Sequence, residues 1–183
     1  MFARTDRLYL RPGFTEDAPA LAAAIGDEAV ARNLASLPWP YGPAQAASFI
    51  DLPDEPLLPR LLILLRGAAQ PRIIGGIGIH QREGQLELGY WIARAHWGRG
   101  FATEAGRAVM AIARANRLPR LTSGHFIDNA ASGAVLRKLG FRAIGRSEQR
   151  SNAARGTTVS CALYEEGDAD AAADLCAPMP LAA

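Results

Sequence analysis

The hydrophobic pattern of this chain changes its period between Glu87 and Ala113, and two glycines stand at the change. Apolar residues alternate with others up to Ile92, which is typical of a strand. From Phe101 onward they recur at helical spacing. The segment Gly98–Arg99–Gly100 lies between the two patterns. The fold must therefore contain a strand that passes through a loop of small residues into a helix.

This glycine loop has the composition of an anion-binding turn. Glycines lack the β-carbons that would keep a ligand away from the backbone. A helix that begins near Phe101 offers unpaired N–H groups and a partial positive charge, and Arg99 adds a fixed charge beside them. A pyrophosphate fits such a site. The spacing alone fits equally well a plain turn without a ligand, in which Thr103 caps the helix.

The rest of the chain supplies further strands and helices. The periodicity and the turn residues predict strands, about seven in all, flanked by helices, in an α/β fold with α+β features. The loop 38–43, rich in Pro and aromatic residues, cannot be regular structure. The expected strands are 7–11, 60–66, 72–80, 85–92, 121–127, 141–145 and 157–164. The expected helices are 18–25, 27–34, 44–50, one that begins near Phe101 and is ended by Leu118–Pro119, and 130–139.

Length and charge limit the classes of protein to consider. The 183 residues fit one domain, 1–166, followed by an acidic, Ala-rich tail, 167–183, that we expect to be disordered. Residues 1–164 carry 20 basic and 13 acidic residues, a balance that suits an anionic ligand, although most of these charges are expected at the surface. The chain lacks the basic run of a nucleic-acid binder.

Membrane and metal signals are also missing from the sequence. The longest apolar run, 61–65, is far shorter than the roughly 20 residues that span a bilayer, and the N-terminus has no signal core. Cys161 and Cys176 fit no metal spacing. We expect a cytoplasmic protein without a metal and without a membrane or nucleic-acid partner.

Three separated motifs resemble the GNAT superfamily of N-acyltransferases, and most of all its ribosomal-protein N-acetyltransferase branch. They are Thr5–Pro12, the long segment Glu87–Ala105, and Asp128–Phe141 with its Asp–Asn–Ala–Ala–Ser start. The resemblance covers roughly residues 5–164. One departure concerns the loop pattern Q/R-x-x-G-x-G/A, because its first position falls on Trp97.

The resemblance implies a sheet that splays after its fourth strand and holds acetyl-CoA in the gap. One N–H group of the exposed strand edge would polarise the thioester carbonyl. Asn129 matches a residue that holds the pantetheine arm, but it fits equally well as the N-cap of the following helix. The residues implied in acetyl-CoA binding are Trp91, Ile92, Ala93, Trp97, Gly98, Arg99, Gly100, Phe101, Ala102, Thr103 and Asn129.

The resemblance also implies direct attack of a primary amine on the thioester. The acceptor would be a protein N-terminus or a small molecule, and the enzyme a monomer or homodimer. Ser132 matches a proposed proton donor to the leaving thiolate, or it is simply a polar residue of the first helical turn. As general base we expect Glu87 first and His125 second, although each also fits a structural role in its strand.

The acceptor pocket is expected beside the loop that contains Trp39 and Tyr41, by analogy with the branch. The same loop also fits a small satellite core. The leading function is therefore N-acetyl transfer from acetyl-CoA to a primary amine. The alternatives are a non-catalytic acyl-CoA-binding module and, with the basic body as its only support, a nucleic-acid binder.

Overall fold

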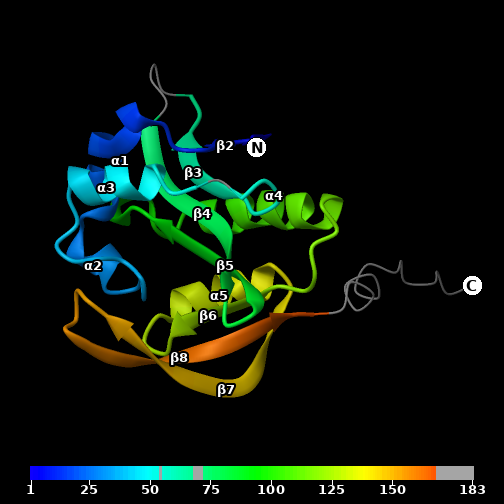
Figure 1. The fold of residues 1–183 in the computed structure, drawn as a ribbon. Coiled ribbons are helices and arrows are strands. Elements are labelled where there is room, and N and C mark those ends of the chain that lie inside the picture. The colour runs from blue at the N-terminus through cyan, green and yellow to red at the C-terminus, as the bar shows by residue number, and fades with distance from the viewer. Residues whose placement is uncertain (54, 68–71, 168–183) are drawn as a thin grey trace, which may run out of the picture.

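The computed structural model describes residues 1–53, 55–67 and 72–167 (Figure 1). An eight-stranded sheet has the order β1-β2-β3-β4-β5-β6-β8-β7. Its strands are β1 (Ala3–Arg4), β2 (Leu8–Arg11), β3 (Arg60–Leu65), β4 (Arg72–Arg82), β5 (Gln85–Ile92), β6 (Thr122–Phe126), β7 (Phe141–Asn152) and β8 (Thr157–Glu166). The helices are α1 (Ala18–Ile25), α2 (Glu28–Ala31), α3 (Pro43–Ile50), α4 (Phe101–Ala115) and α5 (Ala130–Lys138), with two short 3₁₀ turns at Thr15–Asp17 and Arg94–His96.

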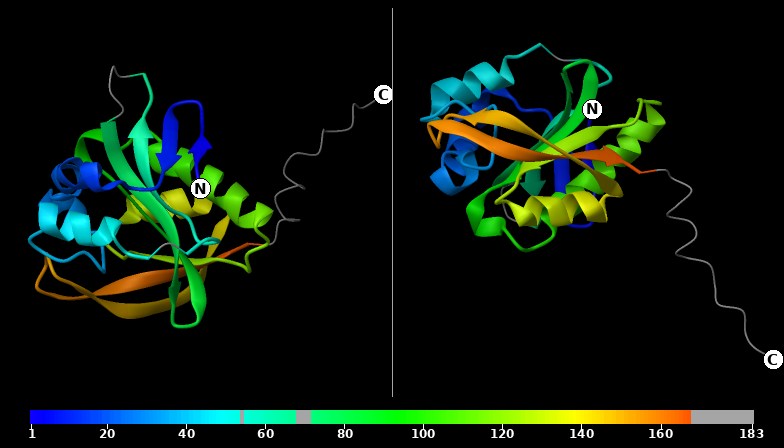
Figure 2. Two further views of the ribbon diagram at one scale, coloured as in Figure 1. Left: turned by 45° about the horizontal axis from the view of Figure 1, so that its top comes forward. Right: turned by 90° about the horizontal axis from the view of Figure 1, so that it is seen from below.

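Helices cover both faces of the sheet because its central strands are apolar on both sides. On β3, Leu61 and Ile63 belong to the core beneath α4 and α5, whereas Leu62 and Leu64 belong to a second core beneath α1 and α3. Alternate residues of a strand point to opposite faces, so one short strand serves both cores. Figures 1 and 2 show α1–α3 on one side and α4 on the other.

The sheet opens between β5 and β6. All other neighbouring strands run antiparallel, but β5 and β6 are parallel and are paired at one position, Glu87 with Thr122. Beyond that position, the Ser123 hydroxyl donates to the carbonyl of Leu88 at 2.8 Å in place of a backbone group. The predicted splay after the strand 85–92 is present, and it leaves part of the edge of β5 without a neighbouring strand.

Most predicted elements are found, one strand is added, and two elements differ clearly in extent. The sheet gains the two-residue strand β1. The predicted helix 27–34 ends at Ala31. Beyond it, the N–H groups of Asn33 and Leu34 bond to carbonyls three residues earlier in the chain. The Asn152 side chain donates to the carbonyls of Ala31 and Leu34. The predicted strand 141–145 extends to Asn152, because Gly145, with a φ of +70°, lies in a bulge and does not end the strand.

Two features bear on the wider organisation of the chain. No helix among the described residues is long and apolar enough to cross a membrane. The predicted disordered tail, 167–183, lies outside the described residues except for Gly167.

Candidate active site

The free edge of β5 exposes alternate backbone groups. The N–H of Ala93 donates to the carbonyl of Ile74 on the neighbouring segment at 2.8 Å. Because the backbone groups of an antiparallel strand alternate in direction, those of Trp91 also face β4, and those of Tyr90 and Ile92 face the gap. Of the three predicted edge residues, only Ile92 therefore directs its N–H toward a ligand, and Tyr90 joins it.

Trp97, which departs from the expected loop pattern, lies at the end of this edge. Its indole Nε1 donates to the carbonyl of Ile92 at 2.6 Å. The bond satisfies the last outward carbonyl of β5 and leaves the N–H of Ile92 as the donor there. Trp97 thus fixes the strand end, and its ring also lines the cavity.

The glycine loop has the backbone expected of an anion cradle. Gly98 and Gly100 adopt φ values of +72° and +78°, a region that favours glycine. A β-carbon added at Gly98 would meet nothing within 4 Å, and one at Gly100 only the Arg7 side chain at 3.6 Å. No side chain caps α4, so the N–H groups of its first turn remain for a ligand. The 15 residues of α4 place a positive dipole end at this open space.

Cationic side chains surround the loop. The guanidinium groups of Arg7 and Arg99 both lie over the ring of Phe101, at 4.6 and 5.0 Å from its centre. Arg7 also donates to the carbonyl of Arg99 and pairs with Glu104. Burial lowers the pKa of His96, and the charge of Arg99 lowers it further, so His96 is neutral at pH 7. In the sequence, Arg7 appears only as part of the first motif. Its contact with Arg99, 92 residues away, was not predicted.

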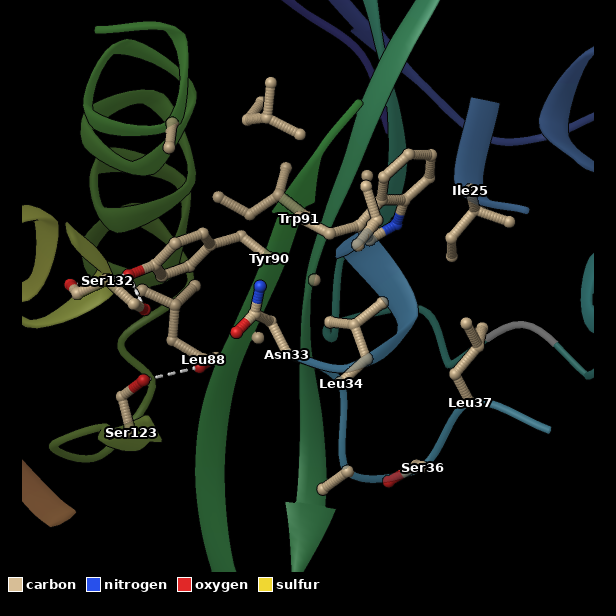
Figure 3. Close-up of a pocket in the computed structure, with 18 of the residues that line it drawn as sticks. Ile25, Asn33, Leu34, Ser36, Leu37, Leu88, Tyr90, Trp91, Ser123 and Ser132 are labelled. Atoms are coloured by element: carbon tan, nitrogen blue, oxygen red, sulfur yellow. Dashed lines mark hydrogen bonds between the residues drawn. The ribbon is translucent and has the colours of Figure 1, made fainter. Parts of the chain in front are cut away.

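Asn129 and Ser132 meet at the start of α5. The Asn129 side-chain oxygen accepts the N–H of Ser132 at 3.2 Å, so Asn129 is the N-cap of this helix. The Ser132 hydroxyl lies 2.7 Å from the hydroxyl of Tyr90, which also donates to the Ser132 carbonyl at 3.0 Å. Burial raises the pKa of Tyr90 to about 12, so its proton is retained at neutral pH. Figure 3 shows Tyr90 pointing from β5 to Ser132.

Glu87 lies on the opposite face of β5, in a network of ion pairs. Both of its oxygens accept from the Arg150 guanidinium at 2.7 Å, and both side chains are buried. Arg150 also binds Glu148 at 2.5 Å, and Arg82 binds Glu148 at 3.1 Å. Burial opposes ionisation of Glu148, but its bond to Arg150 and the nearby charges lower its pKa overall. Arg150 was not predicted, because it lies 63 residues from Glu87 on another strand.

The other predicted residues are spread around the site. The Nδ1 of His125 lies 2.8 Å from the carbonyl of Phe126, and its ring packs on Tyr164. Tyr41 lines the cavity, and burial raises its pKa. Trp39 is half-buried in the same loop but does not line the cavity. The structure thus brings Glu87, His125, Ser132 and Tyr41 to one cavity and leaves Trp39 outside it.

One cavity of about 1310 Å³ joins these features. It runs from the glycine loop and the start of α5, past the free edge of β5, to the loop between α2 and α3. Two ligands that enter from opposite faces of the sheet can therefore meet at Tyr90 and Ile92. Among the described residues, no cluster of His, Cys, Asp and Glu has the composition to hold a metal ion.

Comparison with known proteins assigns this arrangement to a family. The sequence model of the acetyltransferase (GNAT) domain matches residues 7–142, most of the chain. The chain belongs to the GNAT acetyltransferase family. It is an acetyl-CoA-dependent acetyltransferase, as the glycine cradle and the splayed sheet indicate.

Individual relatives agree with this assignment. The acetyltransferase is 34% identical over 150 residues to the uncharacterized N-acetyltransferase YoaA of Bacillus subtilis, covering 77% of this chain and 82% of that protein. A GNAT-family acetyltransferase structure from Bacillus anthracis aligns with a TM-score of 0.75 at 20% identity, over 90% of this chain and 97% of that chain. RimL, a ribosomal L7/L12 α-N-protein acetyltransferase in complex with coenzyme A, aligns with a TM-score of 0.74 at 19% identity, over 91% and 97%. The structural matches show that the fold is shared.

Proposed function

We propose that this acetyltransferase moves an acetyl group from acetyl-CoA to a primary amine, on a protein N-terminus or a small molecule, by direct attack. The observation that carries the proposal is the single cavity that joins the two faces of the sheet at the free edge of β5. A thioester held at that edge is accessible to an amine from the other face without a covalent enzyme intermediate.

The residues of the acetyl-CoA side have distinct binding roles in this proposal. The loop Gly98–Gly100 and the first turn of α4 hold the pyrophosphate, with Arg99 as a neighbouring charge. Asn129 uses its side-chain oxygen as an N-cap, so its amide N–H groups are the part left to bind a pantetheine carbonyl. The edge N–H of Ile92 donates to the thioester oxygen and stabilises the negative charge that develops there.

Ser132 gives a proton to the departing thiolate, and Tyr90 keeps the serine hydroxyl in place. The Tyr90 hydroxyl has one proton, which it keeps at neutral pH; when that proton turns from the Ser132 carbonyl to Ser132 Oγ, the serine proton is free for the sulfur. Tyr90 is half-buried, and its hydroxyl lies within hydrogen-bond distance of two Ser132 oxygens, so the two residues need little reorganisation during the reaction.

The attacking amine must first lose a proton, since an alkylammonium has a pKa of about 10. We propose that the proton leaves through water in the cavity, with Glu87 as the acceptor to test first and His125 second. Both oxygens of Glu87 are bound by Arg150 at 2.7 Å, so a proton that reached this carboxylate directly would displace one of these bonds. A water-mediated route avoids opening that ion pair.

The deciding experiment is a screen of primary amines with acetyl-CoA, with the release of free thiol as the readout. We expect turnover with at least one class of amine and formation of an N-acetyl product by mass spectrometry. A chain that binds acetyl-CoA in calorimetry but acetylates no amine or peptide N-terminus would be a non-catalytic acyl-CoA-binding module.

A further inference from the structure

The face of β5 opposite Ser132 is bare at its centre. Tyr90 points toward α5, so its neighbours Gly89 and Trp91 point to the side of α1–α3, as Figure 3 shows for Trp91. The register pairs Gly89 with Gly78 and Trp91 with Gly76 of β4. All four residues line the cavity. The floor of the amine side is therefore made of Trp91, whose indole lies against Gly76, and of the backbone at Gly78 and Gly89.

Gly89 differs from the other glycines of this floor. A β-carbon at Gly76 would lie 2.6 Å from the indole of Trp91, and one at Gly78 would lie 2.8 Å from the carbonyl of Pro59. At Gly89 the nearest atom would be in the His80 ring, at an ordinary 3.5 Å, and the backbone does not adopt a positive φ. Neither packing nor backbone requires glycine at position 89, so its bare surface leaves room for a ligand.

Charges around this floor are compensated. Among the described residues, the acidic side chains that line the cavity are Glu55, which is exposed, and Glu87, whose two oxygens are bound by Arg150. Arg82 is paired with Glu148. In the interior of this described part, a second cationic group of the amine would meet no unpaired carboxylate, and an anionic group would compete with two existing ion pairs.

The wall on the side of α1–α3 is largely apolar. Figure 3 shows Ile25, Leu34, Leu37 and Trp91 there, with the polar side chains of Asn33 and Ser36 among them. Apolar contacts of this kind contribute about 25 cal/mol for each Å² removed from water. They favour a hydrocarbon or aromatic group and penalise a charged one.

We propose that the acceptor is a primary amine on an uncharged, apolar group that lies over Gly89 between Trp91 and the Glu87–Arg150 pair. This inference rests on the proposed function and narrows it to a substrate class. Gly89 determines how large that group can be.

The first test compares matched amines at one pH, with kcat/KM corrected for the fraction of neutral amine. The panel is 2-phenylethylamine against agmatine, which adds a second cation, and phenylalanine amide against phenylalanine, which adds a carboxylate. We expect the uncharged member of each pair to have a kcat/KM at least tenfold higher. A preference for agmatine or phenylalanine would overturn the inference and leave amine acetylation intact, whereas no turnover with any amine would overturn both.

The second test adds a methyl group at the floor. Gly89→Ala should lower kcat/KM for 2-phenylethylamine at least fivefold through KM, leave ethylamine unaffected, and preserve both the acetyl-CoA affinity and the melting temperature. Gly42→Ala is the matched control, because Gly42 also lacks a positive φ and lies outside the cavity lining. Equal losses for both amines, or no loss for either, would remove Gly89 from the acceptor site.

Discussion

The hydroxyls of Ser132 and Tyr90 form one short contact, and their separate effects on the reaction are measurable. We expect Ser132→Ala to lower the acetyl-transfer rate at least tenfold, since general acid catalysis contributes about 10²–10⁴-fold where it operates. Tyr90→Phe should lower kcat by a smaller factor than Ser132→Ala, because it leaves the serine hydroxyl in place. Acetyl-CoA affinity should change little in both variants.

The double variant provides the control for this pair. If Tyr90 acts through Ser132, removing both hydroxyls should cost no more than removing that of Ser132 alone. Near-parental turnover of Ser132→Ala with a lowered melting temperature would instead assign the serine to the helix start.

Glu87 combines a proposed role as proton acceptor with a buried ion pair. Glu87→Gln keeps the shape of the side chain and one acceptor oxygen for Arg150, and we expect at least tenfold lower turnover with little change in acetyl-CoA affinity. The pH–rate profile should lose the limb that reports a carboxylate. If rate and profile match the parent while the melting temperature falls, Glu87 serves only to balance Arg150, and His125 is tested next.

At the residue scale, the sequence predicted which residues gather at the site better than it predicted their contacts. Glu87, Ser132 and Asn129 line the cavity as expected. Tyr90 and Arg150 were missed, because their partners are 42 and 63 residues away and no local spacing reveals such contacts. Ala93 was grouped with the free edge because a strand pattern does not show which alternate amides face the neighbouring strand.

At the scale of elements, the junction of the glycine loop with α4 can be tested by closing its open backbone. We expect Gly100→Val to weaken acetyl-CoA binding at least tenfold, because a branched side chain would occupy the proposed pyrophosphate cradle. The φ of +78° also imposes a strain of about 1–2 kcal/mol on any residue with a β-carbon.

Gly84→Val separates the effect on binding from the effect of strain. Gly84 has a φ of +79° in the hairpin between β4 and β5, outside the cavity lining. Both variants should lose similar stability, and only Gly100→Val should lose affinity in calorimetry. Equal affinities for acetyl-CoA would show that the cradle lies elsewhere.

The elements that the sequence predicted well are those with local signals. The predicted bounds of Ala18–Ile25 and Gln85–Ile92 match the structure, because each is limited by a helix-ending or turn glycine. The end of α2 and the length of β7 were not predicted. The end of α2 depends on the Asn152 side chain, which comes from more than 100 residues away, and the length of β7 depends on the bulge that accommodates Gly145.

At the scale of the whole molecule, the β7–β8 hairpin connects the two ligand sides. Arg155 lies in the turn of this hairpin; it donates to the carbonyl of Arg32 at 2.8 Å and pairs with Asp128, the residue before Asn129. Asn152 donates to the carbonyls of Ala31 and Leu34, at the start of the loop that forms the wall of the amine side. The hairpin thus holds the amine-side loop and the start of α5 in one arrangement.

Removing the Asn152 amide should therefore affect both stability and the amine side. Asn152 is 1% exposed and its side-chain oxygen also accepts the N–H of Arg155 at 2.8 Å, so Asn152→Ala removes three side-chain bonds to the backbone, although the Ala31 carbonyl and the Arg155 N–H each keep a backbone bond. We expect a loss of about 1–3 kcal/mol in the free energy of unfolding. Because the loop from Leu34 to Tyr41 loses its anchor, KM for the amine should rise at least threefold while the acetyl-CoA affinity stays within twofold.

The control is Ser151→Ala, a change at an exposed neighbour on β7, and it should match the parent in both measurements. An unchanged amine KM in a destabilised Asn152→Ala would show that the hairpin supports the fold without shaping the acceptor pocket.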